Sequence, residues 1–261
     1  MATGAGGERV LQVVCIKQVA DTETRVKVAP DGRTLDPTAV TWILNPYDEF
    51  ALEQALRVRE AAGEGEIVVL SLGGPGVQTT LRGALAMGAD RAIHLRTDVA
   101  QPDSLQVSHA LAAEIRGLDA RILWFGKQAV DDDAAQVPPM VAELLGHPCV
   151  TVVAAFELAP GGATAVVERE VEGGREVVEV TLPAVLSAEK GLNEPRYASL
   201  KGIMAAKKKP IDEKPVTLSP AALETISLAL PAPRAPGRII GQGAAAVPEL
   251  VRVLREEAKV I

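Results

Sequence analysis

The sequence predicts a doubly wound α/β fold with a mostly parallel sheet, and three observations carry this prediction. Apolar runs rich in β-branched residues alternate with amphipathic segments of helical period as far as Leu145. Hydrophobic residues make up 48% of the chain but aromatic residues only 3%, so the core must be built from Val, Leu, Ile and Ala, as in parallel sheets buried on both faces. With 261 residues, the chain is long enough for one large domain with an appendage.

Successive strand-and-helix units account for the predicted sheet. The first strand covers 10–16, and its carboxyl end leads into a polar loop that begins at Lys17. Turn signals between 26 and 40 predict a short hairpin or excursion. The first helix begins at Asn45–Glu49, where proline and acidic residues suit a first turn. Further strands are expected at 66–72, 91–95 and 121–125, and the helices are expected to end near Ala62, Met87, Arg116 and Leu145.

After Leu145, strand-like alternation replaces the helical period. A loop and a short basic helix then occupy 189–210, and prolines crowd the chain beyond Pro210 until a final amphipathic helix. We therefore predict an α/β domain over 1–210, with an added β-hairpin, and an extended C-terminal arm over 211–261. Strands are expected at 150–158, 164–170, 176–182 and 183–187. A long arm cannot bury its own apolar residues, so we expect several to lie on another chain: Ile239, Ile240, Leu250, Val253 and Leu254.

Composition limits the classes of function. The formal net charge of −7 argues against nonspecific nucleic-acid binding. The sequence has no apolar run of the roughly 20 residues that a membrane span needs, and Met1–Arg9 lacks the apolar core of a signal peptide. We therefore expect a cytoplasmic protein without direct membrane insertion. Cys15 and Cys149 stand in separate apolar runs without metal-ligand spacing, so we expect buried, unpaired thiols.

The turn over Gly126–Gln136 is the main candidate site. It follows the apolar run 121–125 and precedes a helix, and ligands of open α/β sheets bind at such carboxyl ends. Free N–H groups of a first helical turn favour an anion such as phosphate, and Gly126 would let backbone approach it. Asp131–Asp133 would repel phosphate, so we expect them to cap the helix or accept hydrogen bonds from ribose or adenine, leaving phosphate to main-chain N–H groups and Lys127. The alternative is a solvated turn with an N-cap.

Other candidate sites match no complete binding or catalytic motif. Gly73–Gly76 follow a strand but lack both dinucleotide-binding spacing and a P-loop lysine, which favours a tight turn. The three histidines have no nucleophile or metal-ligand spacing around them, and the sequence has no hydrolase elbow or zinc-protease motif. We therefore do not expect a self-sufficient enzyme. Leu200, Ile203 and Met204 share one side of the basic helix, which is either a docking site or a face packed on its own domain.

Five motifs give the chain a close resemblance to the beta subunits of electron transfer flavoproteins, over essentially its full length. These motifs are Asn45-Pro46 with Asp48-Glu49, the run Ala84–Arg91, the turn Gly126–Asp133 with Gln136, Val167–Glu170 with Gly173-Gly174, and Leu192–Ala198.

The resemblance implies a Rossmann-like sheet of adenine-nucleotide-binding type in a heterodimer. The alpha subunit would hold most of a redox-active FAD, and this chain would bind an AMP without redox chemistry. The AMP site carried over by position comprises Cys15, Asn45, Pro46, Tyr47, Asp48, Leu72, Gly126, Lys127, Gln128, Ala129, Val130, Asp131, Asp132, Asp133, Ala134, Ala135, Gln136 and Val137.

The resemblance also implies partners. Acyl-CoA dehydrogenases and similar flavin dehydrogenases would dock on a recognition loop over Arg196–Ala205, and a membrane electron transfer flavoprotein:quinone oxidoreductase would take the electrons. Leu200 would be the apolar anchor of that loop. The docking residues implied are Arg196, Tyr197, Leu200, Ile203 and Met204. Glu170 matches a carboxylate that helps to position the mobile flavin domain, the alternative being one exposed hairpin charge among several.

Two alternatives stay open. Relatives that bifurcate electrons bind a second FAD in place of AMP; Asp132 and Pro138 favour AMP, whereas Lys17–Val19 and Asp21-Thr22 are closer to the bifurcating branch. Many relatives also carry a tyrosine near the flavin at the position of Thr22, which argues against a flavin contact from that loop here. The second alternative, of another class, is a standalone adenine-nucleotide hydrolase or sensor.

Overall fold

The computed structural model describes residues 10–234 and 236–261. The strands are β1 (Leu11–Cys15), β2 (Gln18–Ala20), β3 (Trp42–Leu44), β4 (Glu66–Gly73), β5 (Arg91–Arg96), β6 (Ile122–Gly126), β7 (Cys149–Leu158), β8 (Thr164–Val171), β9 (Gly174–Thr181), β10 (Ala184–Ala188) and β11 (Ile211–Pro215). The helices are α1 (Pro46–Ala62), α2 (Val77–Met87), α3 (Ser104–Ile115), α4 (Val137–Leu145), α5 (Leu200–Ala206) and α6 (Val247–Arg252), with short 3₁₀ turns at Pro37–Ala39 and Ala244–Ala246 and a π turn at Val253–Glu257.

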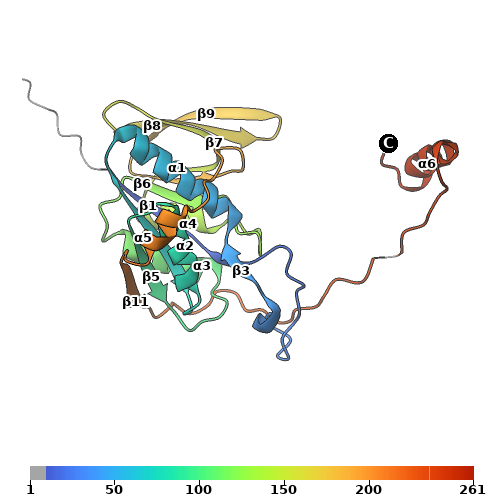
Figure 1. Cartoon of the computed structure of the whole chain (residues 1–261), viewed down its shortest axis with the longest axis horizontal. Coiled ribbons are helices and arrows are strands. Elements are labelled where there is room, and N and C mark those ends of the chain that lie inside the picture. The colour runs from blue at the N-terminus through green and yellow to red at the C-terminus, as the bar shows by residue number, and fades with distance from the viewer. Residues whose placement is uncertain (1–9, 235) are drawn as a thin grey trace, which may run out of the picture. The chain divides into compact units, whose positions relative to one another are not determined.

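The predicted mostly parallel sheet is confirmed. Among the described residues, nine strands form one sheet in the order β11-β5-β4-β1-β6-β10-β7-β8-β9 (Figure 1). All neighbours from β11 to β7 pair in parallel, and the hairpin of β8 and β9 continues the sheet in antiparallel pairing. Strands β2 and β3 form a separate antiparallel pair.

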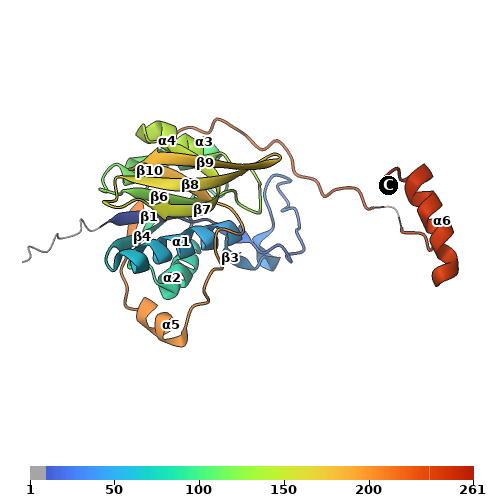
Figure 2. The ribbon, with the colours of Figure 1, turned by 90° about the horizontal axis from the view of Figure 1, so that it is seen from above.

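Helices cover both faces of the parallel strands, as a doubly wound fold requires. Figure 2 shows α1 and α2 on one side of the sheet and α3 and α4 on the other. The two faces have separate apolar clusters, one around Trp124, Leu52 and Leu56 and the other around Leu70 and Leu123. Burial of both strand faces is the reason that the strands read as continuous apolar runs in the sequence.

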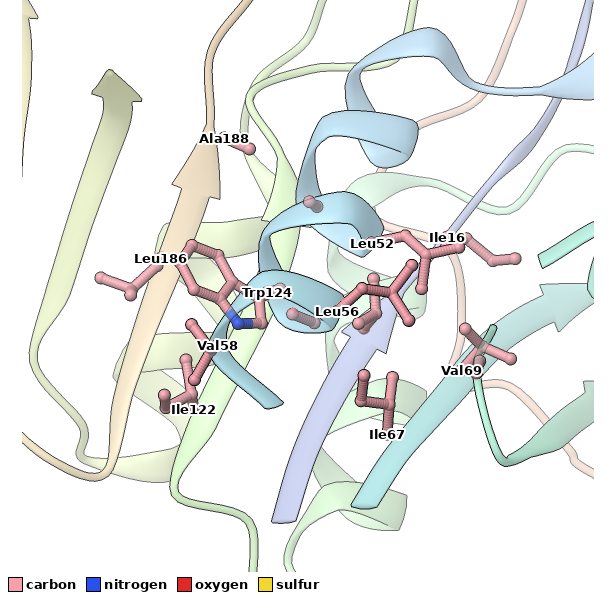
Figure 3. Packing of buried hydrophobic residues seen from close by; sticks show 14 of the residues in the cluster. Ile16, Leu52, Leu56, Val58, Ile67, Val69, Ile122, Trp124, Leu186 and Ala188 are labelled. Carbon is pink, nitrogen blue, oxygen red and sulfur yellow. The ribbon is translucent and has the colours of Figure 1, made fainter. Parts of the chain in front are cut away.

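Trp124 is the centre of the first cluster. Its indole is fully buried under α1, beside Leu52, Leu56 and Leu186 (Figure 3). The indole N–H donates to Oε1 of Gln12 at 3.0 Å, and the Gln12 amide donates to the Ala55 carbonyl at 3.0 Å. These bonds satisfy the buried polar atoms and tie β6, β1 and α1 together.

The order in which strands are added to the sheet reverses at β1. From β1 the chain moves through α1 to β4 and through α2 to β5, and it then returns through α3 to β6 on the other side of β1. The carboxyl ends of β1 and β6 therefore border the switch point of the sheet, where open α/β sheets bind their ligands. The turn after Gly126 begins at this place.

The structure divides the chain later than the predicted boundary at residue 210. Ile211–Pro215 form β11, which pairs in parallel with β5 at the edge of the sheet. The compact α/β unit extends to Ser227, and Leu228–Ile261 form a second unit that contains α6. Lys17–Thr22 also differ from the predicted polar loop, because Gln18–Ala20 pair with Trp42–Leu44.

Several expectations from composition concern the described residues. No helix among them has the length and apolar character needed to cross a bilayer. Cys15 and Cys149 are both free thiols, as predicted, but Cys149 is exposed and not buried, which corrects the prediction. The prediction about Met1–Arg9 lies outside the described residues.

Candidate functional site

The switch-point turn, residues 126–137, is fastened to the first turn of α1. The Asn45 side chain forms two hydrogen bonds with the backbone of this turn. Its Nδ2 donates to the Gln128 carbonyl at 2.9 Å, and its Oδ1 accepts from the Val130 amide at 3.1 Å. Asn45 is 1% exposed, so its polar atoms need these partners. The motif Asn45-Pro46 thus begins a helix and also shapes the turn.

Asp48 joins the ends of the two strands at the switch point. Its Oδ2 accepts from the Lys17 amide at 2.7 Å, and its Oδ1 accepts from the Gly126 amide at 3.0 Å. Burial raises the pKa of Asp48 to about 7, although hydrogen bonds from Lys17, Asn45 and Gly126 act in the opposite direction. The carboxylate therefore serves as internal scaffolding of the site.

Gly126 has a different structural role from the predicted close approach of an anion. A β-carbon at this position would lie 2.3 Å from Oδ1 of Asp48 and 2.7 Å from Cβ of Tyr47. The glycine therefore allows α1, and not an anion, to approach the end of β6. This close contact brings Tyr47 and Asp48 beside the switch-point turn.

The predicted capping role of the three aspartates is wrong. Helix α4 begins at Val137 behind Gln136, with no side-chain cap, several residues after the aspartates. Instead, the Lys17 ammonium lies 2.8 Å from Oδ1 of Asp131 and 3.0 Å from Oδ2 of Asp132. Burial alone would lower the pKa of Lys17, but the hydrogen bonds and charges of these carboxylates raise it. Asp133 accepts from the Gln128 side chain.

Lys127, the predicted phosphate contact, already has an anionic partner. Its ammonium lies 2.6 Å from Oε2 of Glu189 and 5.7 Å from the centre of the Tyr47 ring. The hydrogen bond to Glu189 outweighs burial and raises the pKa of Lys127. An anion at the turn would therefore meet a lysine whose charge Glu189 largely offsets.

Main-chain amides offer the better anion contact. Ala135 has a φ of 53°, in the left-handed region, and Gln136 follows in right-handed helical conformation (φ −95°, ψ −32°). Successive amides in such alternating conformation form a concavity, or nest, that favours anions. Among the described residues, the amides of Ala135, Gln136 and Val137 have no hydrogen-bond acceptor. We refer to these three residues as the amide nest.

The helix N-terminus that the sequence predicted as the phosphate contact has few free amides. Positions 138 and 139 are prolines, which have no N–H, and the Met140 amide donates to the Gln136 carbonyl at 3.1 Å. The first turn of α4 therefore contributes little beyond Val137. The prolines were visible in the sequence, but the left-handed conformation of Ala135 was not.

The remaining predicted site residues differ in how open they are. Cys15 is buried at the end of β1, where desolvation raises its thiol pKa well above the ordinary value. Leu72 lies near the end of β4 and packs against the cluster under α3 and α4. In contrast, residues 131–136 of the turn are all exposed, Ala134 and Gln136 included. The site thus has a buried base and an open outer rim.

The predicted docking residues lie apart from this turn, on and before α5. Leu200, Ile203 and Met204 are 76%, 46% and 64% exposed, and Tyr197 is 98% exposed. Among the described residues, this face of α5 is therefore not packed against the chain's own α/β domain. Glu170 lies on the outer face of the β8–β9 hairpin, 3.5 Å from the Arg175 guanidinium.

The fold and the switch-point turn define a class of protein: a doubly wound α/β protein with an amide nest at the point where strand order reverses. Residues 33–219 match the family model described as the electron transfer flavoprotein domain. The chain therefore belongs to the electron transfer flavoprotein family.

Similar curated proteins from several organisms are beta subunits of this family. One from Syntrophomonas wolfei is 43% identical over 86% of this chain and 87% of its own length. One from Bacillus subtilis is 40% identical over 95% of this chain and 98% of its own length, and a mitochondrial one from Arabidopsis thaliana is 38% identical over 95% and 99%. The resemblance inferred from the five motifs is thus confirmed.

Proposed function

We propose that the switch-point turn binds AMP as a structural ligand. The observation that carries the proposal is the amide nest, whose three unpaired N–H groups suit one phosphate group. The exposed carboxylates of Asp131 and Asp132 suit the hydroxyl groups of ribose, since ionised carboxylates only accept hydrogen bonds. Such a ligand would stabilise the folded chain by mass action.

The chain is proposed to be the beta subunit of a heterodimer whose alpha subunit carries FAD. The second unit, Leu228–Ile261, supports this proposal because apolar side chains are exposed along it, among them Leu230 (60%), Ile239 (86%) and Val247 (52%). Exposed apolar clusters of this kind mark interaction surfaces. FAD would supply the redox chemistry, and this chain would contribute binding and orientation without catalytic groups of its own.

The exposed face of α5 is the proposed docking site for acyl-CoA dehydrogenases and similar flavin dehydrogenases. Leu200, Ile203 and Met204 give it an apolar centre, and the exposed Lys201 and Lys207 give it a positive rim. A partner would therefore offer an apolar pocket with acidic residues around it. The electrons would pass to electron transfer flavoprotein:quinone oxidoreductase, in the cytoplasm and as part of fatty acid oxidation.

Purification of the chain together with its alpha subunit tests the proposed function. The expected product is a yellow heterodimer that a flavin dehydrogenase reduces. A colourless monomer that hydrolyses ATP by itself would contradict the proposal and support the standalone hydrolase instead.

A further inference from the structure

Arg196, which the resemblance places in the docking loop, is held by carboxylates of α1. Its Nε donates to Oε2 of Glu53 at 2.7 Å and its Nη2 to Oε1 of Glu53 at 3.0 Å, a two-bond pairing. The same guanidinium donates to both carboxylate oxygens of Glu60, at 2.5 and 3.0 Å. Because these carboxylates already accept hydrogen bonds from Nε, Nη1 and Nη2, the Arg196 guanidinium has few N–H groups available for a docking partner.

Glu53 is the buried member of this cluster. It is 3% exposed, and it also accepts from the Arg196 backbone amide at 3.2 Å and from the Arg57 side chain at 3.0 Å. Burial would raise the pKa of Glu53, but the hydrogen bonds from Arg196 and Arg57 outweigh it and lower the pKa below its ordinary value. Without Arg196, the buried Glu53 carboxylate would keep its bond from Arg57 but lose the bonds from the Arg196 guanidinium, which is locally destabilising because a buried charge needs its partners.

A second contact fixes the same segment to α1. The Asn193 side chain donates to the Phe50 carbonyl at 3.0 Å and to the Gln54 side chain at 3.2 Å, and Asn193 is 8% exposed. Residues 193–196 are therefore anchored along one side of α1 through Phe50, Glu53 and Gln54.

The far end of α5 is fastened to α2. A β-carbon on Gly202 would lie 2.3 Å from the Ala86 carbonyl oxygen, so the two backbones touch. The Arg82 guanidinium donates to the carbonyls of Ala206 and Lys209 at 2.6 and 2.5 Å, and the Lys209 ammonium donates to the Leu85 carbonyl at 3.0 Å. Helix α5 thus rests on α2 through Gly202 and its C-terminal end.

We propose that Glu53 and Arg196 are positioning residues for docking: their ion pair holds α5 so that Leu200, Ile203 and Met204 point outward before a partner arrives. This inference rests on the docking role proposed for α5. A helix of seven residues is not stable alone in water, so its conformation depends on these anchors. An anchored docking helix avoids the entropic cost of ordering at each encounter.

The test uses Glu53→Gln and Arg196→Lys in the flavin-bearing heterodimer. The glutamine amide cannot offer two charged oxygens, and the lysine side chain keeps the positive charge but loses the planar fork. We expect the KM for the heterodimer in reduction by a flavin dehydrogenase to rise about tenfold at unchanged kcat. A change of this size matches the entropic cost of ordering one or two flexible side chains on binding. Amide hydrogen exchange over 194–206 should accelerate in both variants, while the bound flavin stays unchanged. Glu64→Gln, an exposed position beyond the end of α1, is the matched control.

Leu200→Ala separates the two proposals. A higher KM for Leu200→Ala with wild-type KM and exchange rates for Glu53→Gln and Arg196→Lys would overturn the positioning role and leave the docking site standing. Wild-type KM for Leu200→Ala would overturn the docking role of α5 and the positioning role with it. Higher KM in all three variants, with faster exchange only in the two ion-pair variants, is the expected result.

Discussion

Ala135 is a non-glycine residue whose backbone lies in the left-handed region, with a φ of 53°. A non-glycine residue in this conformation costs about 1–2 kcal/mol, and such strain persists where the surrounding structure holds it in place. Here the strained residue is the first of the amide nest. The strain is therefore consistent with a backbone shaped for a ligand.

The amide nest gives a first prediction at the residue scale. Ala135→Val places a β-branched side chain at positive φ, where it is a severe outlier, and should turn the amides away from a common centre. We expect AMP affinity to fall by about tenfold or more, whereas Ala135→Gly, which accepts positive φ freely, should keep it. Isothermal titration of nucleotide-free heterodimer with AMP measures both. Equal affinity for AMP in the valine and glycine variants would exclude the nest as the phosphate contact.

Asp48 gives a second prediction. Its pKa rises from 3.8 to about 7 in the folded chain, so the folded state holds the proton more tightly. The resulting stabilisation is fully present below 3.8 and is lost as pH rises to about 7, in total about 4 kcal/mol. The asparagine in Asp48→Asn cannot ionise, so its contribution to stability does not change with pH, although the substitution also removes one hydrogen-bond acceptor. Urea unfolding at several pH values should show wild-type stability falling relative to the variant across that window; a constant difference would contradict the raised pKa.

At the element scale, the contact between α1 and the end of β6 gives a third prediction. Gly126→Ala would place Cβ 2.3 Å from Oδ1 of Asp48, so α1 must shift. We expect the free energy of unfolding to fall by about 1–3 kcal/mol, as for other overpacked sites. Gly83→Ala is the matched control, because Gly83 lies within α2 with no atom near the added Cβ; it should gain about 0.5–1 kcal/mol. Chemical denaturation distinguishes them, and equal effects would refute the close contact.

Elements with strong local signals were predictable from the sequence. Helix α2 ends at Met87 as predicted, and α1 begins at Pro46 behind Asn45 as expected. Strand β11 was not predictable, because Ile211–Pro215 alternate weakly, carry charges and lie among prolines. Its pairing with β5 depends on tertiary contact at a sheet edge, where proline and charged residues are tolerated.

The site was predictable in its position but not in its contacts. The switch-point argument placed the candidate site in the turn after the strand at 121–125, and the structure brings the ammonium of Lys17, at the end of β1, against Asp131 and Asp132 of that turn. Two roles differ from those predicted: Gly126 allows α1 to approach, and Asp131 and Asp132 pair with Lys17 instead of capping α4. Both depend on which side chains approach from distant segments, and a local pattern does not contain that information.

At the scale of the whole molecule, the division after Ser227 gives a fourth prediction. A variant that lacks 228–261 keeps the sheet and the first unit's core, so circular dichroism should show a folded, cooperatively melting protein. It should no longer retain the alpha subunit in co-purification, because it has lost the exposed apolar residues of the second unit. A truncated chain that still forms the yellow heterodimer would assign the subunit contact to the α/β unit alone.

The central claim is that the switch-point turn binds AMP while the flavin belongs to a partner chain. Mass analysis of the nucleotides released from the purified heterodimer tests it most directly. We predict one FAD and one AMP per heterodimer. Two FAD and no AMP, or no adenine nucleotide other than a single FAD, would contradict the claim.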